Sequence, residues 1–330
     1  MKNLQINQLT SIDSTISFRG IYTVSDSEVW ITGSNNSVFR TINNGNSWNK
    51  IVINDSLTLD FRDVHVNNRG EIFIMSSGPS RKSRIYCSTN RGIAWDTKYV
   101  NPYKDGFLNS IAFWNDSTGI AVGDPVKNRI FILLTKDGGI SWHESEISAI
   151  PPALPGEIGF AASGTSIAVF RDSLAWIGTG GSQARIYYST DIGNSWNVVN
   201  TPILHGGETT GIYSVQFLDE YTGYIAGGDY NAPESTDSTL GFTKDGGQSW
   251  KLIGNQQVPF QSAIGKIQSK YEYFISTGTA GTYYSKDGIN WELLTDLGFN
   301  CLSTSPTGKA IWLAGSNGRV AQIIVNKWSF

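Results

Sequence analysis

Short apolar runs alternate with polar turns along the whole chain. Examples are Val29–Gly33 (VWITG), Trp176–Gly180 (WIGTG) and Ile311–Gly315 (IWLAG), each of which ends in glycine. β-Branched and aromatic residues dominate these runs, and Gly, Asn and Asp separate them, which is the pattern of short β-strands joined by tight turns. We find no amphipathic helical stretch of useful length. The pattern therefore predicts an all-β protein.

A signature that ends in tryptophan recurs between the strands. Three copies are most alike, namely Thr135–Trp142 (TKDGGISW), Ser189–Trp196 (STDIGNSW) and Thr243–Trp250 (TKDGGQSW). The weaker copies are Thr41–Trp48, Ser88–Trp95 and the shorter Ser285–Trp291. Their tryptophans are 47, 47, 54, 54 and 41 residues apart along the chain. A period of roughly 40–50 residues with short strands is typical of a β-propeller, and 330 residues hold about seven such units.

The end of the chain predicts how the ring closes. The units run over residues 15–58, 59–104, 105–155, 156–207, 208–257, 258–296 and 297–330, and the seventh stops without a signature or a fourth strand. We expect residues 4–9 to supply that strand, because closure removes unpaired strand edges. The prediction is one domain over residues 1–330: a seven-bladed β-propeller of four-stranded antiparallel blades, with the N-terminal strand completing the last blade.

The signature itself has a structural explanation. A short Asp or Asn at its third position, such as Asp137 or Asn43, bonds backbone N–H groups about two residues on and holds a turn. Glycine at the fifth position permits a positive φ, and the Trp returns to the next strand as a large apolar side chain. Each loop holds at most one such carboxylate, whereas calcium requires several ligands, so we expect no metal there.

These segments resemble Asp-box (BNR) repeats, which occur in sialidases, sortilin-type receptors and two-propeller xyloglucanases. Thr118–Asp124 (TGIAVGD) with Thr135–Trp142 resembles more closely the photosystem II stability/assembly-factor-like propellers. That group includes many exported bacterial proteins of unassigned function, some labelled oxidoreductases. The resemblance covers nearly the whole chain and implies the fold more strongly than an activity. The sialidase Arg-Ile-Pro motif is absent.

Composition narrows the classes of function. The net charge is −3 and 16% of residues are charged, so we expect no nucleic-acid groove. No run reaches the ~18 apolar residues of a membrane-spanning helix. The start, MKNLQINQLT, has no apolar core of signal-peptide length. The chain is therefore either cytoplasmic or a mature form without its leader, and the resemblance favours an extracytoplasmic protein. Cys87 and Cys301 lie in different units and are expected to be unpaired.

One residue of each unit is predicted to lie at the mouth of a central channel. The anchor is the central apolar residue of each first strand, for example Ile21 or Val64, and the residue two positions earlier shares its strand face. These residues are Arg19, Arg62, Asn109, Thr165, Tyr213, Ser262 and Asn300. Loops after the second strands reach the same face of the ring and carry Arg81, Lys82, Arg84, Asp124, Lys127, Arg129, Arg185, Asp229 and Arg319.

Positive charge therefore gathers on one face of the predicted ring. Arginine presents a planar fork that suits carboxylate or phosphate. The expected function is a monomeric, non-catalytic binding or assembly scaffold whose partner is a protein or an anionic or glycan small molecule. The candidate ligand-binding residues are Arg19, Arg62, Asn109, Asp124, Arg129, Glu157, Thr165, Arg185, Tyr213 and Asp229. The alternative is a water-filled channel lined by internal Arg–Asp pairs.

A carbohydrate-active enzyme is the second class of function. A carboxylate pair for glycoside hydrolysis would come from among Asp124, Glu157, Glu208 and Asp229. The small residues of Gly156–Thr165 (GEIGFAASGT) either allow a ligand to approach the backbone or let a strand enter a crowded ring. The long loop Asp229–Leu240 is either functional or a tolerated insertion. The histidines lack metal-ligand spacing and no phosphate-binding motif occurs, so we expect neither metal nor cofactor.

Overall fold

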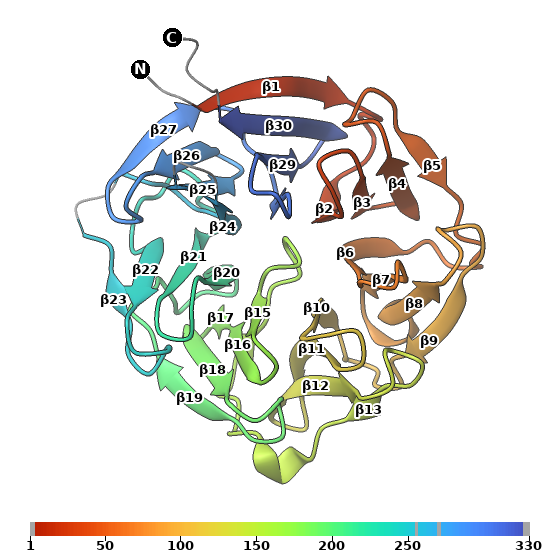
Figure 1. Ribbon diagram of the computed structural model, residues 1–330. Helices are drawn as coiled ribbons and strands as arrows, with labels where there is room; N and C mark the ends of the chain where they lie inside the picture. The colour runs from red at the N-terminus through yellow and green to blue at the C-terminus, as the bar shows by residue number, and fades with distance from the viewer. Residues whose placement is uncertain (1–3, 255–256, 269–271, 326–330) are drawn as a thin grey trace.

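The chain forms a ring of antiparallel sheets. The computed structural model describes residues 4–254, 257–268 and 272–325, and within them seven sheets surround a common axis (Figure 1). The helical elements in these ranges are two short 3-10 turns, η1 (Ser80–Lys82) and η2 (Ile147–Ala149). This arrangement confirms the predicted seven-bladed, all-β propeller.

Blades 1 to 3 each have four strands, given from the axis outward. Blade 1 consists of β2 (Phe18–Thr23), β3 (Val29–Gly33), β4 (Ser37–Thr41) and β5 (Asn49–Ile51). Blade 2 consists of β6 (Asp60–Val66), β7 (Ile72–Ser77), β8 (Arg84–Ser88) and β9 (Asp96–Val100). Blade 3 consists of β10 (Leu108–Phe113), β11 (Gly119–Val126), β12 (Arg129–Thr135) and β13 (His143–Glu144).

Blades 4 to 6 repeat this order with one addition. Blade 4 consists of β15 (Ile167–Phe170), β16 (Leu174–Gly178), β18 (Arg185–Ser189) and β19 (Asn197–Asn200). Blade 5 consists of β20 (Thr210–Phe217), β21 (Gly223–Asp229), β22 (Leu240–Thr243) and β23 (Lys251–Leu252). Blade 6 consists of β24 (Ala263–Gln268), β25 (Glu272–Gly278), β26 (Gly281–Ser285) and β27 (Trp291–Thr295). The addition is a pair of short strands, β14 (Glu157–Ile158) and β17 (Gly180–Gly181), which extend the blade 5 sheet beyond β20.

Both ends of the described chain build blade 7. Its strands are β28 (Cys301–Thr304), β29 (Ala310–Ala314), β30 (Arg319–Val325) and β1 (Leu4–Ser11). The outermost strand β1 pairs antiparallel with β30, from Leu4 opposite Val325 to Ser11 opposite Arg319 (Figure 1). The predicted closure by the N-terminal strand is thus confirmed, and the strand is slightly longer than expected.

Apolar side chains fill the spaces between neighbouring blades. Phe18 of blade 1 packs in one cluster with Trp312 of blade 7, and Trp30 of blade 1 packs with Phe61 of blade 2. Because the second strand of a blade is covered on both faces, every residue of β3 and β7 is buried. This explains why these strands read as continuous apolar runs rather than as alternating ones.

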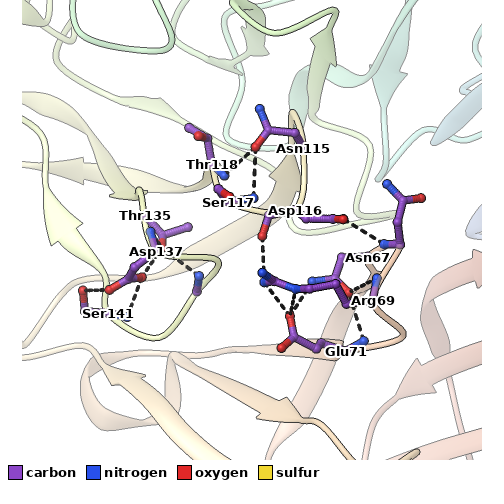
Figure 2. A network of polar contacts seen from close by, with 12 residues as sticks. Asn67, Arg69, Glu71, Asn115, Asp116, Ser117, Thr118, Thr135, Asp137 and Ser141 are labelled. Carbon is purple, nitrogen blue, oxygen red and sulfur yellow. Dashed lines mark hydrogen bonds and ion pairs between the residues drawn. The ribbon is translucent and has the colours of Figure 1, made fainter.

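The Asp/Trp turns lie at the end of the ring where the innermost strands finish, which we call the lower face. The opposite end is the upper face. In the turn after β12, Asp137 Oδ1 accepts hydrogen bonds from Thr135 Oγ1 (2.8 Å) and from the Ser141 N–H (3.0 Å) (Figure 2). The backbone bond spans four residues rather than the predicted two, because the carboxylate closes the whole turn.

The lower face also links blade 2 to blade 3. Arg69 Nη2 lies 2.7 Å from Glu71 Oε2 and donates to the Asp116 carbonyl oxygen at 2.8 Å (Figure 2). The Asn68 N–H donates to Asp116 Oδ1 at 2.9 Å. These contacts join the β6–β7 turn to the β10–β11 turn and are part of the scaffold.

Acid titration of the Asp/Trp turns gives a first prediction. Hydrogen bonds from Ser141 hold the pKa of Asp137 at about 2, below the value of about 3.9 for an unperturbed Asp. The contribution of the ionised Asp137 to stability is therefore complete above about pH 3.9, the pKa of an unperturbed Asp, and is lost as pH falls through about 2. We expect Asp137→Asn to make the free energy of unfolding fall less steeply between about pH 4 and pH 2.

Urea unfolding followed by tryptophan fluorescence at a series of pH values measures this effect. The matched control is Asp172→Asn, which changes an exposed aspartate in the β15–β16 turn, outside the Asp/Trp turns. An acid-limb slope that stays the same in Asp137→Asn would contradict the role assigned to the carboxylate.

Candidate functional site

Four of the predicted mouth residues occupy equivalent positions in their blades. In blade 1, Phe18 pairs with Gly33 and Gly20 pairs with Thr32, so that Arg19 is an extra residue, a β-bulge. The same irregularity occurs in the first strands of blades 2, 3 and 5. It falls at Arg62, Asn109 and Tyr213. A bulge re-aims its side chain, so the two-residue periodicity used to predict these positions does not hold there.

The bulges bring two arginines together on adjacent innermost strands. A Cβ placed on Gly20 would lie only 2.8 Å from the Cα of Asp63, which shows how closely β2 approaches β6 beside Arg19 and Arg62. Burial lowers the pKa of Arg62, and the positive charge of Arg19 lowers it further. The two guanidinium groups therefore share one electrostatic environment.

The two arginines differ in their partners. Arg62 Nε and Nη2 each lie 2.8 Å from Asp60 Oδ2, and Arg62 Nη1 donates to the Ala161 carbonyl oxygen at 3.0 Å. Arg19 is partly buried, and within the described residues it makes neither a hydrogen bond nor an ion pair. Of these two guanidinium groups, Arg19 is thus the one that has no polar partner in the described part of the chain.

The chain itself fills the upper part of the ring centre. The segment before β15, residues 159–166, reaches inward (Figure 1), where Phe160 stacks on Tyr213 with ring centroids 3.9 Å apart. A Cβ on Gly164 would lie 2.3 Å from Asp63 Oδ1. The small residues of this segment therefore let the chain enter a crowded ring. A cavity of about 270 Å³ remains towards the lower face, lined by residues of all seven blades.

Three other predicted mouth residues tie neighbouring blades together. Thr165 Oγ1 lies 2.7 Å from Ser214 Oγ. Ser262 Oγ donates to the Asn300 carbonyl oxygen at 2.7 Å, and Asn300 Nδ2 donates to the Phe18 carbonyl oxygen at 2.9 Å. Each side chain has an internal partner, which gives it a structural role in the ring.

Asp124 and Asp229 also have internal partners. Asp124 Oδ1 accepts from Asn109 Nδ2 (3.0 Å) and from the Gly159 N–H (2.9 Å). Burial raises the pKa of Asp124 against the effect of these two hydrogen bonds. Asp229 Oδ1 accepts from Thr209 Oγ1 at 2.6 Å. Asp124 holds the inward-reaching segment to blade 3, and Asp229 holds the loop before β20.

Glu157 and Arg185 form a buried ion pair. The Glu157 side chain is 0% exposed and the Arg185 side chain 9% exposed. Glu157 Oε1 accepts from Arg185 Nε (3.0 Å) and from Thr179 Oγ1 (2.7 Å), and Arg185 Nη2 donates to Glu157 Oε2 and to the Pro152 carbonyl oxygen (2.8 Å). The structure therefore directs these two predicted ligand residues to each other, at the added strands β14 and β17.

The remaining predicted polar residues do not assemble into a second site. Arg129 donates to the Asn128 carbonyl oxygen at 2.9 Å, and Glu208 is exposed. The described contacts join no two of the four carboxylates considered for glycoside hydrolysis. Among the described residues, no group of three or more His, Cys, Asp or Glu side chains is placed to hold a metal ion, and no helix there is long and apolar enough to cross a bilayer.

Sequence reasoning missed Tyr230, which begins the long loop after β21. Its side chain is 43% exposed, and its ring meets Phe260 edge-on with centroids 6.0 Å apart. Phe260 meets Tyr213 in the same way at 4.7 Å. The electrostatic effect of Tyr230 also raises the pKa of Arg62, against the larger effect of burial. We call Arg19, Arg62, Tyr213 and Tyr230 the mouth cluster. Only the unusual length of the loop signalled Tyr230.

Comparisons with known proteins support the fold. No protein-family model and no curated protein sequence matches the chain. A solved structure described as YCF48 bound to D1 peptide aligns with TM-score 0.61 and 13% identity, over 98% of this chain and 96% of that one. YCF48 from Cyanidioschyzon merolae aligns with TM-score 0.61 and 16% identity, over 97% and 98%. U3-55K aligns with TM-score 0.63 and 11% identity, over 97% and 98%. At these identities the likeness shows a shared propeller fold.

Proposed function

We propose that this propeller is a non-catalytic binding or assembly module that holds an anionic group of a partner protein at the mouth cluster. The observation that carries the proposal is Arg19, a partly buried guanidinium without a partner in the described chain. A partly desolvated charge gains free energy when a ligand supplies acceptor oxygens. Arg62, on the adjacent strand, adds a second positive charge.

Two further observations support a binding role. Loops and strand ends on a rigid scaffold commonly carry binding sites. Arg19, Arg62 and Tyr213 of the mouth cluster lie near the starts of innermost strands, and Tyr230 lies in a loop. A structural neighbour with the same fold is described as bound to a D1 peptide. This analogy of fold favours a peptide-like partner but does not define its sequence. We further propose an extracytoplasmic location, which rests on the resemblance to exported propellers and on the low charge content.

Replacement of Arg19 tests the proposal. We expect Arg19→Gln to weaken binding of fluorescein-labelled Asp/Glu-containing peptides roughly 10- to 100-fold, the loss of one charge-assisted hydrogen bond. Fluorescence anisotropy measures the Kd, with Asn/Gln peptides as neutral probes. Lys136→Gln is the matched control, because it removes an exposed positive charge on the lower face. Equal affinities for wild type, Arg19→Gln and Lys136→Gln would overturn the proposed site.

A further inference from the structure

One of the two arginines of the mouth cluster lacks a counterion. Arg62 is neutralised by Asp60, whose Oδ2 lies 2.8 Å from Arg62 Nη2. Arg19 has no ion pair within the described residues. A ligand with one negative charge therefore supplies the counterion that Arg19 lacks, whereas a phosphate dianion or a run of acids would bring further negative charges close to Asp229, which also acts on Tyr213. Uncompensated charge at a partly desolvated position is costly, so charge balance favours a single carboxylate.

Four aromatic side chains pack in a row that includes Tyr213 of blade 5, and blade 5 lies across the ring from blade 1 (Figure 1). Phe160 stacks on Tyr213 at 3.9 Å, Tyr213 meets Phe260 at 4.7 Å, and Phe260 supports Tyr230 at 6.0 Å. The outermost ring, Tyr230, is 43% exposed. A supported, partly exposed tyrosine provides contact area at a low entropic cost, and such residues commonly anchor peptide side chains.

We propose that the mouth cluster recognises a peptide segment in which a single carboxylate lies next to an aromatic residue. Arg19 holds the carboxylate in its guanidinium fork, and the aromatic ring packs on Tyr230. The ligand lies across the mouth of the ring, because Arg19 belongs to blade 1 and Tyr230 follows the second strand of blade 5. This inference rests on the proposed function and specifies its ligand.

Four matched peptides test the charge requirement. Each contains Phe, and they carry next to it a free C-terminal carboxylate, a Glu side chain with an amidated end, a phosphoserine with an amidated end, or no charge. Isothermal titration calorimetry gives each Kd. We expect one or both carboxylate peptides to bind, the uncharged peptide not to bind, and the phosphoserine peptide to bind no more tightly than the better carboxylate peptide. The first two peptides distinguish a chain terminus from a side chain as the source.

Two variants test the assigned contacts. Arg19→Gln is expected to weaken the carboxylate peptides roughly 10- to 100-fold. Tyr230→Ala is expected to weaken the Phe peptides about 10-fold while leaving matched Ala peptides unchanged. Lys136→Gln serves again as the control for general charge, and circular dichroism verifies that each variant is folded.

The outcomes separate the two proposals. Three results would overturn the inference about the ligand. The first is tighter binding of the phosphoserine peptide, the second is no binding of either carboxylate peptide at millimolar concentration, and the third is an unaltered Kd in Tyr230→Ala. In the first and third cases the proposed function still stands if Arg19→Gln weakens the peptides that do bind. If Arg19→Gln leaves every anionic probe unaffected, both the inference and the proposed function fail.

Discussion

Replacing Arg185 with Met is expected to lower the free energy of unfolding by about 3–5 kcal/mol. The change leaves Glu157, whose side chain is 0% exposed, as a buried carboxylate without its cation. Thr179 and the Leu154 N–H still donate to it, at 2.7 and 2.8 Å, but they do not replace the charge of Arg185. Urea unfolding at pH 7 measures the loss.

Two comparisons isolate the buried charge as the cause. Arg171→Met removes an arginine that pairs with Glu220 but is 64% exposed, so its expected cost is under about 1 kcal/mol. Adding Glu157→Gln to Arg185→Met is expected to restore part of the lost stability, because the unpaired charge is then removed. A cost for Arg185→Met no larger than that for Arg171→Met would show that the pair does not hold β14 and β17 in place.

Deleting residues 1–11 is expected to abolish cooperative folding of the ring or to lower its stability by on the order of 5 kcal/mol, much of the 5–15 kcal/mol typical of a domain. The deletion removes β1, which pairs with β30 from Val325 to Arg319. It leaves β30 as an open edge that invites aggregation. Thermal unfolding and size-exclusion chromatography of the truncated protein measure the two effects.

A point substitution in the same strand serves as the control. Leu9 lies in β1 but is 52% exposed, so Leu9→Ala keeps the pairing and is expected to change Tm by only a few degrees or less. A truncated protein that stays monomeric, with the Tm of the full chain, would mean that β1 does not close the ring.

The fold could be predicted because local sequence patterns that repeat along the chain specify it. The period of the tryptophans gave the number of blades, and the incomplete last unit pointed to residues 4–9 as the missing strand. Continuous apolar runs such as Val29–Gly33 marked strands covered on both faces. Each of these patterns can be recognised within one repeat unit or by comparing units, so that no knowledge of contacts between distant residues is needed.

The candidate site was less predictable because its geometry depends on such contacts. Nothing in the alternation of side chains marks the bulge that re-aims Arg19. The pairing of Glu157 with Arg185 joins residues on two separate strands, β14 and β18. From sequence position alone, Glu157 and Arg185 were each predicted to be available to a ligand. The small residues of Gly156–Thr165 had two interpretations, ligand approach to the backbone or entry of the chain into a crowded ring. The stacking of Phe160 on Tyr213 favours the second.

The most direct test of the central claim is an NMR titration that follows the arginine Nε–Hε resonances while a Glu-containing peptide is added. Binding at the mouth cluster predicts a saturable shift of the Arg19 resonance, a smaller shift for Arg62, and none for Arg171 on the lower face. A constant Arg19 resonance, or equal shifts at Arg19 and Arg171, would contradict the claim that an anionic group binds at the ring centre.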